Sequence, residues 1–499
     1  MPKKILSQEL LKKWDESTIV NRQISFLELM ESAARQCTSW IHHHFSNEFE
    51  VHVFCGKGNN GGDGLATARL LKEKNYRVHV YVVEESQHAT ECFSKNFQRL
   101  TSSGLEVSFI HSETTTLSIG SKSIVVDALF GSGLNRPVSG LTARIIEQIN
   151  ALNATVISID VPSGMFVDKS SDQNTIVRAT FTLTFQILKL CFLVPENAVS
   201  FGKIEILNIG LDPKFLQESN PVLFLTDIHD IRRIHKTRNA FSHKGTYGHS
   251  LLVAGSKEKM GAAVLCARAC LRSGTGLLTC CIPETGFSVL NSTVPESMAI
   301  SQADNSVHTN LDLYRSVGIG PGLDTKADSE KIVRMVTYAY KKPMVVDADA
   351  LNIISKNKNW MHSLPPDTIL TPHPKEFERL FGPSENDFDR IDKALAMSLE
   401  FNVIIVLKNH HSLVASAGRG YFNPTGNAGM ATGGSGDVLT GIITALLSQG
   451  YVPEEAAVLG VYLHGLAADF SLQNQSVESM LPSDMIEHLG RAFQEISLV

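Results

Sequence analysis

A glycine-rich segment follows the apolar run Val51–Cys55 and precedes a helical pattern. It reads Gly-Lys-Gly-Asn-Asn-Gly-Gly-Asp-Gly over residues 56–64. This glycine spacing lets backbone amides and a helix N-terminus close on a phosphate, although a simple tight turn uses glycines in the same way. Asn59, Asn60 and Asp63 favour ligand binding, because a turn alone does not require such a polar cluster.

Two aspartates end later apolar runs in the same half of the chain. Asp127 is followed by Gly131–Pro137, and Asp160 is followed by Val161-Pro162-Ser163-Gly164. Ligands of open α/β sheets bind outside the carboxyl ends of the strands, where these acids would lie. Each acid alone could be a helix cap or a turn former. Three such loops in one half of the chain favour a ligand site.

The second half contains a glycine-rich loop, residues 427–441, that opens onto a long apolar helical pattern. Backbone amides and a helix dipole at this position form an anion hole suited to a transferring phosphoryl group. Asp437, in the first turn, could take a proton from a hydroxyl as phosphate is delivered; its alternative role is an ordinary acid at a helix N-terminus. No Gly-x-x-x-x-Gly-Lys-Ser/Thr motif occurs, so this is not a P-loop.

Three further segments of the second half suggest ligand contacts. His373 stands between two prolines, which fix its backbone. Gly322 belongs to a rigid Gly-Pro-Gly turn, and Ala262 lies among small residues at an expected helix start. Small residues permit close approach of a ligand, but close packing of helix on strand explains them as well.

Short apolar runs alternate with amphipathic stretches along the chain, which is typical of βα units and largely parallel sheets. Periodicity is lost around residues 209–221, where Pro, Asp, Asn and Ser gather, and we place the domain boundary there. The expected strands are Val51–Cys55, Arg77–Val83, Ser123–Leu129, Thr155–Val161, His249–Ala254, Leu277–Ile282, Arg315–Ile319, Pro343–Ala348 and Val403–Leu407. The expected helices are Gly64–Lys74, Leu141–Leu152, Ala262–Arg272, Gly436–Leu447 and Pro453–Phe470.

The composition limits the classes of partner. A net charge of −6 over 499 residues gives no electrostatic reason to expect nucleic acid or an anionic membrane. There is no signal-peptide pattern, no apolar run of membrane-spanning length, and no cysteine spacing typical of zinc sites or disulfide scaffolds. We therefore expect a cytoplasmic protein without nucleic-acid or membrane partners.

The motifs GKGNNGGDG, DALFGSGLNRPVSG and SIDVPSG together resemble the NAD(P)H-hydrate epimerase family, or YjeF N-terminal domain. The resemblance covers residues 1–215 and implies a Rossmann-like three-layer α/β/α domain. It implies that Asp160 is the acid–base residue that inverts the hydroxylated carbon 6 of the reduced nicotinamide ring. Lys189 matches less closely, because Leu190 and Cys191 follow it where the family usually has a small residue; a strand-end lysine is the alternative.

The same resemblance implies further ligands of this domain. A potassium site is implied at Asn60, Asp127 and Ser163, whose oxygen ligands suit a hard cation. The implied dinucleotide contacts are Asn59, Asn60, Gly61, Gly62, Asp63, Gly131, Ser132, Gly133, Leu134, Asn135, Arg136 and Pro137, with Asp160 also in contact.

Strand–turn–helix units that end in a GSGD helix resemble the ribokinase-like superfamily. Within it, HKGTYG, MGAA, GPGL, TPHPKE and GNAGMATGGSGDVLTG are similar to the NAD(P)H-hydrate dehydratase family, over residues 225–499. By motif, Ala262, Gly322, His373 and Asp437 are implied to contact the hydrated dinucleotide. Lys408, Asn409, His410, His411, Ser412 and Gly436 are implied to bind the adenine nucleotide, with Asn409 where the family usually has glycine. His464 lies in a matching helix and is interpreted as structural.

Together the resemblances imply an enzyme that interconverts R- and S-NAD(P)HX and dehydrates the S epimer to NAD(P)H. The fused arrangement favours ADP, with ATP as the alternative, and K+ and Mg2+ are the implied cations; we also expect a homo-oligomer. Two other interpretations stay open: a kinase for a vitamin-like alcohol, and an N-terminal module that binds a nucleotide without turnover. The TPHPKE motif and the fused first domain argue against the kinase.

Overall fold

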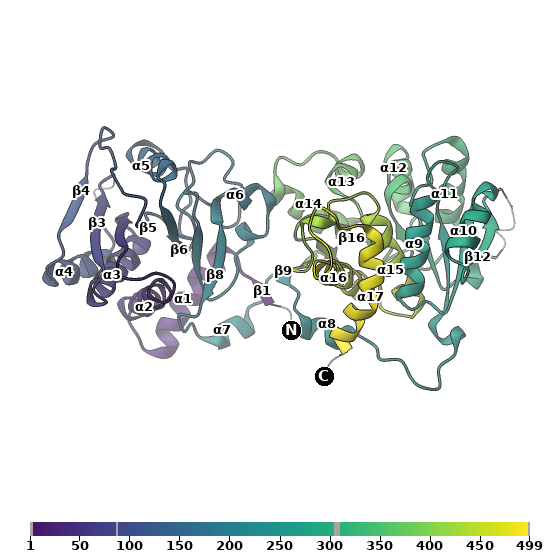
Figure 1. Ribbon diagram of the computed structural model, residues 1–499, viewed down its shortest axis with the longest axis horizontal. Helices are drawn as coiled ribbons and strands as arrows, with labels where there is room; N and C mark the ends of the chain where they lie inside the picture. The colour runs from purple at the N-terminus through teal and green to yellow at the C-terminus, as the bar shows by residue number, and fades with distance from the viewer. Residues whose placement is uncertain (1–2, 86–87, 304–309, 498–499) are drawn as a thin grey trace. The chain divides into compact units, whose positions relative to one another are not determined.

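The computed structural model describes residues 3–85, 88–303 and 310–497. The chain forms two compact units, each with its own sheet and helices (Figure 1). The smaller unit contains Lys4–Pro221 together with Asn386–Phe388, and the rest of the chain from Val222 onward forms the larger unit.

The sheet of the smaller unit is entirely parallel, in the order β4-β3-β2-β5-β6-β7-β8. Its strands are β2 (Glu50–Cys55), β3 (Arg77–Val83), β4 (Val107–Ile110), β5 (Ser123–Ala128), β6 (Thr155–Ile159), β7 (Phe181–Phe185) and β8 (Lys203–Leu207). The helices of this part of the chain are α1 (Gln8–Arg22), α2 (Phe26–His44), α3 (Asn59–Glu73), α4 (Glu91–Ser102), α5 (Gly140–Ala151), α6 (Ala198–Phe201) and α7 (Pro213–Glu218), and β1 (Lys3–Ile5) precedes them.

Two hydrophobic cores lie on opposite faces of this sheet. Val51, Val53 and Cys55 of β2 pack against α2, α3 and α4. Phe54 points the other way and packs with Ile145 and neighbouring residues of α5. Because successive side chains of a strand alternate between faces, one apolar strand supplies both cores. The expected three-layer α/β/α architecture is confirmed.

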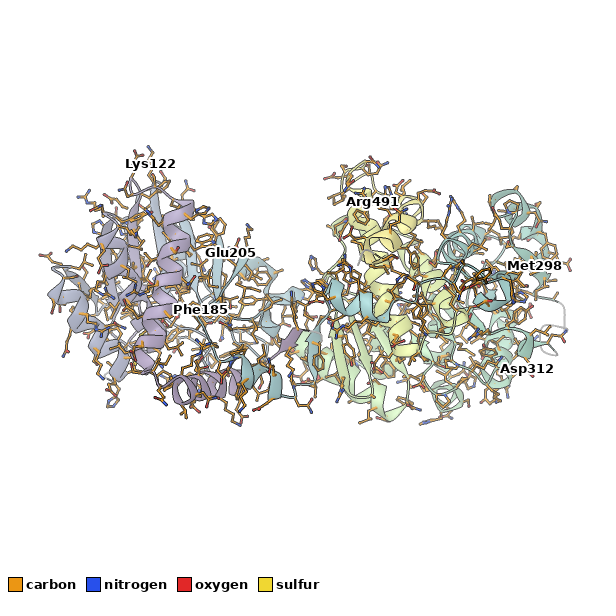
Figure 2. The ribbon with its side chains drawn as sticks, turned by 90° about the horizontal axis from the view of Figure 1, so that it is seen from below. Lys122, Phe185, Glu205, Met298, Asp312 and Arg491 are labelled. Carbon is orange, nitrogen blue, oxygen red and sulfur yellow. The ribbon has the colours of Figure 1, made fainter. Side chains whose placement is uncertain are left out.

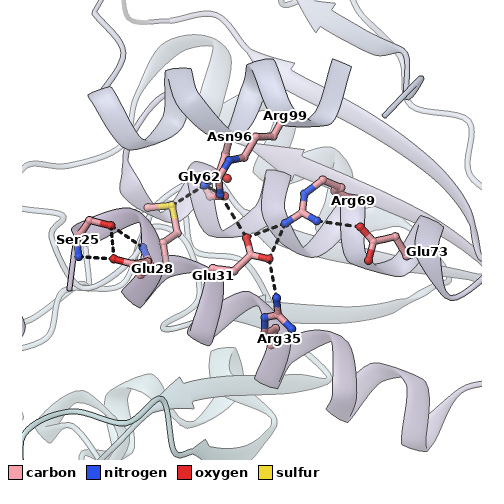
Figure 3. Close-up of polar contacts among 10 residues, drawn as sticks. Ser25, Glu28, Glu31, Arg35, Gly62, Arg69, Glu73, Asn96 and Arg99 are labelled. Carbon is pink, nitrogen blue, oxygen red and sulfur yellow. Dashed lines mark hydrogen bonds and ion pairs between the residues drawn. The ribbon is translucent and has the colours of Figure 1, made fainter. Parts of the chain in front are cut away.

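Helix α3 begins earlier than the sequence suggests. Its first residue is Asn59 rather than Gly64, so Asn59–Asp63 form the first turns of the helix. Glycine is a poor helix former, which hid this start. Asn96 of α4 donates to the Gly62 carbonyl over 3.3 Å, and Arg69 of α3 contacts both carboxylate oxygens of Glu31 over 2.7 Å (Figure 3). The Gly62 contact holds the first turns of α3 against α4, and the Arg69 contact holds the later part of α3 against α2.

Counted from β9, the sheet of the larger unit follows the order β9-β18-β17-β16-β15-β14-β13-β10-β11-β12. Its strands are β9 (Leu223–Leu225), β10 (His249–Val253), β11 (Leu277–Ile282), β12 (Met298–Ser301), β13 (Ser316–Ile319), β14 (Val345–Val346), β15 (Ile369–Leu370), β16 (Ile404–Leu407), β17 (Leu413–Ser416) and β18 (Arg419–Phe422). The helices are α8 (Ile228–Ile234), α9 (Met260–Arg272), α10 (Phe287–Thr293), α11 (Ala327–Ala339), α12 (Ala348–Lys356), α13 (Pro374–Phe381), α14 (Asp387–Glu400), α15 (Ser435–Ser448), α16 (Pro453–Ser471) and α17 (Pro482–Ser497).

Strands β10 to β16 all pair in parallel with one another, whereas β17 is antiparallel to both β16 and β18. The strand order reverses direction between β10 and β13. Right-handed crossovers therefore place α9 and α10 on the face opposite to α11 and α12. Helices α15, α16 and α17 form a large core over β14, β15 and β16. The edge strand β12 leaves Met298 45% exposed (Figure 2).

Some expected strands of this unit are shorter in the structure. Only Val345 and Val346 of the expected strand Pro343–Ala348 pair, because α12 starts at Ala348.

The eight cysteines form no disulfide bond within the described residues, and seven of them are buried while Cys92 is partly exposed. Within the described residues, no helix combines the length and apolarity that a membrane span requires.

Candidate active sites

The first candidate site lies where the strand order of the smaller sheet reverses, between β2 and β5. The chain leaves both strands here, and the Gly56 amide donates to the Ala128 carbonyl over 3.2 Å. Asn60 of α3 donates from its side-chain nitrogen to the Phe130 carbonyl over 2.8 Å. A methyl group on Gly131 would come within 2.9 Å of Asp160 Oδ2 and 3.1 Å of Asn60 Cγ. The structure thus brings the Asn59–Asp63, Gly131–Pro137 and Asp160 segments together at the position where α/β sheets bind ligands.

Asp160 follows β6 in a left-handed backbone conformation, with φ of 71°. Such strain in a residue other than glycine concentrates at functional sites. The Ser132 amide donates to Asp160 Oδ2 over 2.7 Å, and Lys189 Nζ lies 2.9 Å from Oδ1. Burial raises the pKa of Asp160, but the Lys189 charge and the Ser132 hydrogen bond outweigh it, so the pKa lies below its ordinary value. Asp160 is therefore an anion at neutral pH.

Lys189 is not part of a strand, because β7 ends at Phe185. Its side chain is only 3% exposed and also donates to Thr184 Oγ1 over 2.6 Å. The alternative of a strand-end lysine is wrong. The buried ammonium of Lys189 instead forms an ion pair with Asp160, the residue that the sequence indicated as the acid–base group.

Two further acids interact electrostatically with Asp160. Burial first, and then the charges of Asp160 and Asp15, raise the pKa of Asp63 well above its ordinary value. Burial and the Asp160 charge also raise the pKa of Asp15, on α1, to about 7. Asp15 was missed from the sequence, since it sits in a surface-like charged helix with no motif around it. Three carboxyl groups and one lysine thus share this site, and one carboxyl titrates near neutrality.

A second group of oxygen atoms lies beside Asp160. Asp127 is fully buried, and its carboxylate accepts from the hydroxyls of Ser163 over 2.5 Å and Ser158 over 2.7 Å. Ser163 Oγ and the Asn60 amide both lie within 3.0 Å of the Phe130 carbonyl. Burial raises the pKa of Asp127, although hydrogen bonds from Ser163 oppose the shift. Among the described residues, no basic side chain forms an ion pair with Asp127, so the buried carboxylate lacks a countercharge of its own.

The loop Gly131–Pro137 is held mainly through its carbonyls. Gln8 Nε2 donates to the Ser132 carbonyl over 2.6 Å, and Lys169 Nζ donates to that of Asn135 over 3.0 Å. The side chains of Arg136 and Pro137 are exposed. Both side chains can therefore contact a ligand, while Gln8 and Lys169 hold the backbone of the loop.

The second candidate site lies at the start of α15. Gly434 has φ of 100° and turns the chain into the helix, and Asp437 lies in the first turn. Lys408, which follows β16, places its Nζ 2.9 Å from Asp347 Oδ1 and 3.9 Å from Glu376 Oε2. Thr440 of α15 donates to the other oxygen of Asp347 over 2.8 Å. A methyl group on Gly436 would lie 3.3 Å from Lys408 Nζ.

The pKa of Asp437 is raised to about 7. Burial is the main cause and the nearby charge of Asp347 adds to it, whereas Lys408 opposes the shift. Burial lowers the pKa of Lys408, but Asp347 and Glu376 outweigh it, so the pKa is raised and the ammonium stays charged. Asp437 therefore has the pKa of a general base that works near neutrality.

A cavity of about 350 Å³ opens beside the start of α15. Five of the six expected nucleotide-binding residues line it: Lys408, Asn409, His410, Ser412 and Gly436. His411 is not among the lining residues, and its neighbour His410 contacts it through Nδ1 over 3.2 Å.

His464 of α16 also lines this cavity. It is 6% exposed, and its Nε2 has no hydrogen-bond partner among the described residues. Burial lowers its pKa to about 4, so the ring is neutral.

His373 caps the N-terminus of α13. Its Nδ1 accepts from the Lys375 amide over 3.1 Å, and the Glu376 carboxylate accepts from the His373 amide over 2.9 Å. The side chain is 44% exposed, with Nε2 3.4 Å from Glu376 Oε1. The flanking prolines thus belong to a helix start, and Nε2 remains on the accessible side.

Ala262 and Gly322 meet where the larger sheet reverses direction. The Gly255 amide, after β10, donates to the Pro321 carbonyl over 2.8 Å, and a methyl group on Gly322 would lie 2.9 Å from Ala262 Cβ. The chain therefore packs tightly here, as the alternative interpretation expected. Asp347 was not singled out from the sequence, although it directly follows the apolar strand β14.

Fold and sites define a two-domain α/β enzyme with a Rossmann-like domain before a ribokinase-like one. A family model described as NAD(P)H-hydrate dehydratase matches residues 250–491, and one described as YjeF-related protein N-terminus matches residues 27–191. A solved ribokinase-like superfamily protein from Enterococcus faecalis is 26% identical, with a TM-score of 0.52; the match covers 56% of this chain and 99% of that one.

Two relatives that match almost the whole chain carry the same description. The bifunctional NAD(P)H-hydrate repair enzyme Nnr of Thermofilum pendens is 32% identical over 99% of this chain and 95% of its own length. The protein of the same description from Moorella thermoacetica is 33% identical over 93% and 92%. The chain belongs to the family of bifunctional NAD(P)H-hydrate repair enzymes. Both resemblances drawn from the motifs are confirmed.

Proposed function

We propose that the larger unit dehydrates S-NAD(P)HX by a phosphorylation followed by an elimination. Asp437 takes the proton of the ring hydroxyl as that oxygen receives the terminal phosphoryl group of ADP. Phosphate then leaves with a proton from the neighbouring ring carbon, which restores the double bond and gives NAD(P)H, AMP and phosphate. The observation that carries this proposal is Asp437 itself, in the first turn of α15 with a pKa of about 7.

The cavity beside α15 would hold the adenine nucleotide. Lys408 and Gly436 lie next to Asp437, so a phosphate over the helix N-terminus would meet both an ammonium and unobstructed amides. Mg2+ would be held mainly by the nucleotide phosphates, since Lys408 and Thr440 already occupy both oxygens of Asp347. Ala262, Gly322 and His373 would contact the hydrated dinucleotide.

The smaller unit would exchange the two epimers by reversible loss of the hydroxyl at carbon 6. A protonated carboxyl gives its proton to the departing hydroxyl, which leaves as water, and anionic Asp160 stabilises the ring cation. Water then adds to the opposite face and returns a proton to the carboxylate. Asp15, with a pKa of about 7, is suited to this transfer, whereas the lowered pKa of Asp160 favours the electrostatic role. The dinucleotide itself would lie between Asn59–Asp63 and Gly131–Pro137.

A potassium ion fits the oxygen group beside Asp160. Asn60, Asp127 and Ser163 each carry a side-chain oxygen near the Phe130 carbonyl, which Asn60 itself contacts through its amide nitrogen. Asp127 is buried without a basic partner among the described residues. A bound monovalent cation would supply that countercharge and hold the Gly131–Pro137 loop in place.

One assay separates these proposals from a simple kinase. Full-length protein is incubated with hydrated NADH and either ADP or ATP, while absorbance at the NADH band and nucleotide products are followed. We expect recovery of NADH with conversion of ADP to AMP, and a loss of at least about 100-fold in this rate for Asp437→Asn with nucleotide binding retained. A stable phosphorylated alcohol without recovery of NADH would instead identify a kinase.

A further inference from the structure

Two histidines and a glutamate share one face of the smaller sheet, away from both candidate sites. Strands β2 and β3 are parallel, and their register pairs His52 directly with His79. Glu50 precedes His52 by two residues, so it projects from the same face. The three lie near the amino ends of these strands, whereas Asp127 and Asp160 lie at carboxyl ends.

The three side chains converge at metal-ligand spacing. Glu50 Oε2 lies 3.8 Å from His52 Nε2 and 3.8 Å from His79 Nε2, and one ligand atom from each residue falls within 4.8 Å of the others. Donors around a tetrahedral zinc ion are about 3.4 Å apart, given bond lengths of about 2.0–2.2 Å. The two Glu50 pairs are therefore within a few tenths of an ångström of this spacing. The His52 and His79 rings are stacked, with centroids 4.7 Å apart and planes 14° apart, so one ring would have to rotate to point its Nε2 at the shared ion.

Both Nε2 atoms are buried and have no hydrogen-bond partner among the described residues. Buried polar atoms without a partner are rare, and each needs an explanation. The distances of 3.8 Å to the carboxylate are too long for hydrogen bonds, so a protonated imidazole does not account for them.

The surroundings already orient these ligands. Tyr81 OH lies 3.3 Å from His52 Nδ1, which leaves Nε2 for the site. Arg77 Nη1 lies 2.7 Å from Glu50 Oε1, which turns Oε2 toward the histidines. Metal-binding histidines and carboxylates are commonly fixed by such outer contacts. The side chains of Glu50 and His79 are 39% and 38% exposed, so an ion and a water ligand can enter from solvent.

We propose that Glu50, His52 and His79 form a site for a divalent transition metal of the Zn2+ class, with water as the fourth ligand. Imidazole nitrogen favours such metals over the hard cation expected at the oxygen-only group around Asp127. The ion would join the amino ends of β2 and β3, and thereby stabilise the strand that leads into the Asn59–Asp63 turn. Turnover of either reaction does not require it.

The test uses full-length protein freed of metal with a chelator, titrated with ZnCl2 by calorimetry and with CoCl2 by absorption. We expect one site per chain, a tetrahedral cobalt spectrum and a raised thermal midpoint with Zn2+. His79→Asn and Glu50→Gln should each weaken Zn2+ at least tenfold. Both positions are partly exposed, so circular dichroism and dehydratase activity should be unchanged.

The run His42–His44 at the end of α2 offers the matched control, because exposed histidines also bind Zn2+. A variant with all three changed to asparagine should keep the site. Absence of Zn2+ binding by the wild-type protein would overturn the proposal. So would equal affinity in His79→Asn, or loss of binding in the triple asparagine variant alone.

Discussion

Asp347, Glu376 and Asp437 lie near the start of α15, and all three carboxyl groups interact with the ammonium of Lys408. Lys408 contacts Asp347 and Glu376, and this leaves Asp437 without an ion pair of its own among the described contacts. Its charge is therefore only partly compensated, which explains a pKa of about 7 rather than one near 4. The lack of an ion pair therefore gives Asp437 the pKa of a base that acts near neutral pH.

The pH dependence of dehydration should report this carboxyl. We expect kcat/KM to fall as pH drops through about 7, because Asp437 takes up the proton that it must accept from the substrate. The measurement is the rate of NADH recovery across pH at saturating ADP. A profile that stays flat between about pH 5 and 8 would contradict the assignment.

The stability of the fold should also depend on Asp437, but it should fall with rising pH, whereas the dehydration rate rises. The folded pKa lies above the unfolded one, so the unfolded chain binds fewer protons between about pH 4 and 7, and the free energy of unfolding falls as pH rises across this window. Asp437→Asn should therefore raise the free energy of unfolding above pH 7 by roughly 1–3 kcal/mol, and have little effect near pH 4. Urea titrations of both proteins at the two pH values check this.

Lys189 should control the ionisation of Asp160 in the smaller unit. Lys189→Met removes the ammonium, so the pKa of Asp160 should rise and epimerisation should slow by at least about tenfold, with its pH optimum displaced upward. Chirally resolved NADHX and a pH series give the measurement. Lys169→Met is the control and should leave the pH optimum in place, because it changes an exposed lysine that contacts the Asn135 carbonyl and the Phe166 ring.

Sequence motifs predicted the residues that stand inside glycine-rich or proline-rich segments. Asp437 and Asp160 belong to such segments, whereas Lys408 was implied by the family resemblance alone; the structure places all three next to charged partners. Asp15 and Asp347 could not be found in the same way. Asp15 reaches its site through tertiary packing, from a helix at the opposite end of the unit's sequence, and has no local signature. Asp347 does follow an apolar strand, but no glycine-rich or proline-rich segment accompanies it.

At the scale of one element, α15 depends on the turn before it. Gly434 has φ of 100°, and a methyl group there would lie 2.7 Å from Leu265 Cδ1. Gly434→Ala should lower the free energy of unfolding by about 1–3 kcal/mol and reduce dehydration, because it displaces the amides that receive phosphate. The neighbouring Gly433→Ala is the control, since a methyl group there meets nothing within 4 Å. Equal unfolding midpoints for the two variants would contradict this role of Gly434.

Element type was easier to predict from the sequence than element length. The alternation of apolar runs and amphipathic stretches correctly indicated β2, β3, β5, β10 and β11 and the helices α3, α5 and α9. The start of α3 was wrong because glycines and asparagines disfavour helix, and only packing against α2 and α4 overrides that preference. Strand β14 was overestimated because α12 begins immediately after it.

At the scale of the molecule, each ligand should stabilise the unit that binds it. ADP at about 100 times its Kd should add about 2.7 kcal/mol to the unfolding of the larger unit only. K+ in place of Li+ should raise only the transition of the smaller unit, and Asp127→Asn should abolish that difference. Calorimetric scans with each ligand alone provide the measurement. A K+ effect that persists in Asp127→Asn would argue against the oxygen group as its site.

The class of architecture followed from the sequence, but the strand order did not. Repeated βα units specify parallel sheets, and the structure has them in both units. The reversal points between β2 and β5 and between β10 and β13 arise from which strands pair over long distances, as does the antiparallel β16-β17-β18 ribbon. Periodicity along one chain carries no information on such pairing.

The distribution of cysteines gives the protein an internal reporter of unfolding. Cys92 is the partly exposed thiol, and a maleimide should modify it first under native conditions. Every later modification would then record an opening event in one unit or the other, and peptide mapping would tell which. Slow alkylation in the presence of different small molecules could thus map local breathing throughout the chain without any engineered label.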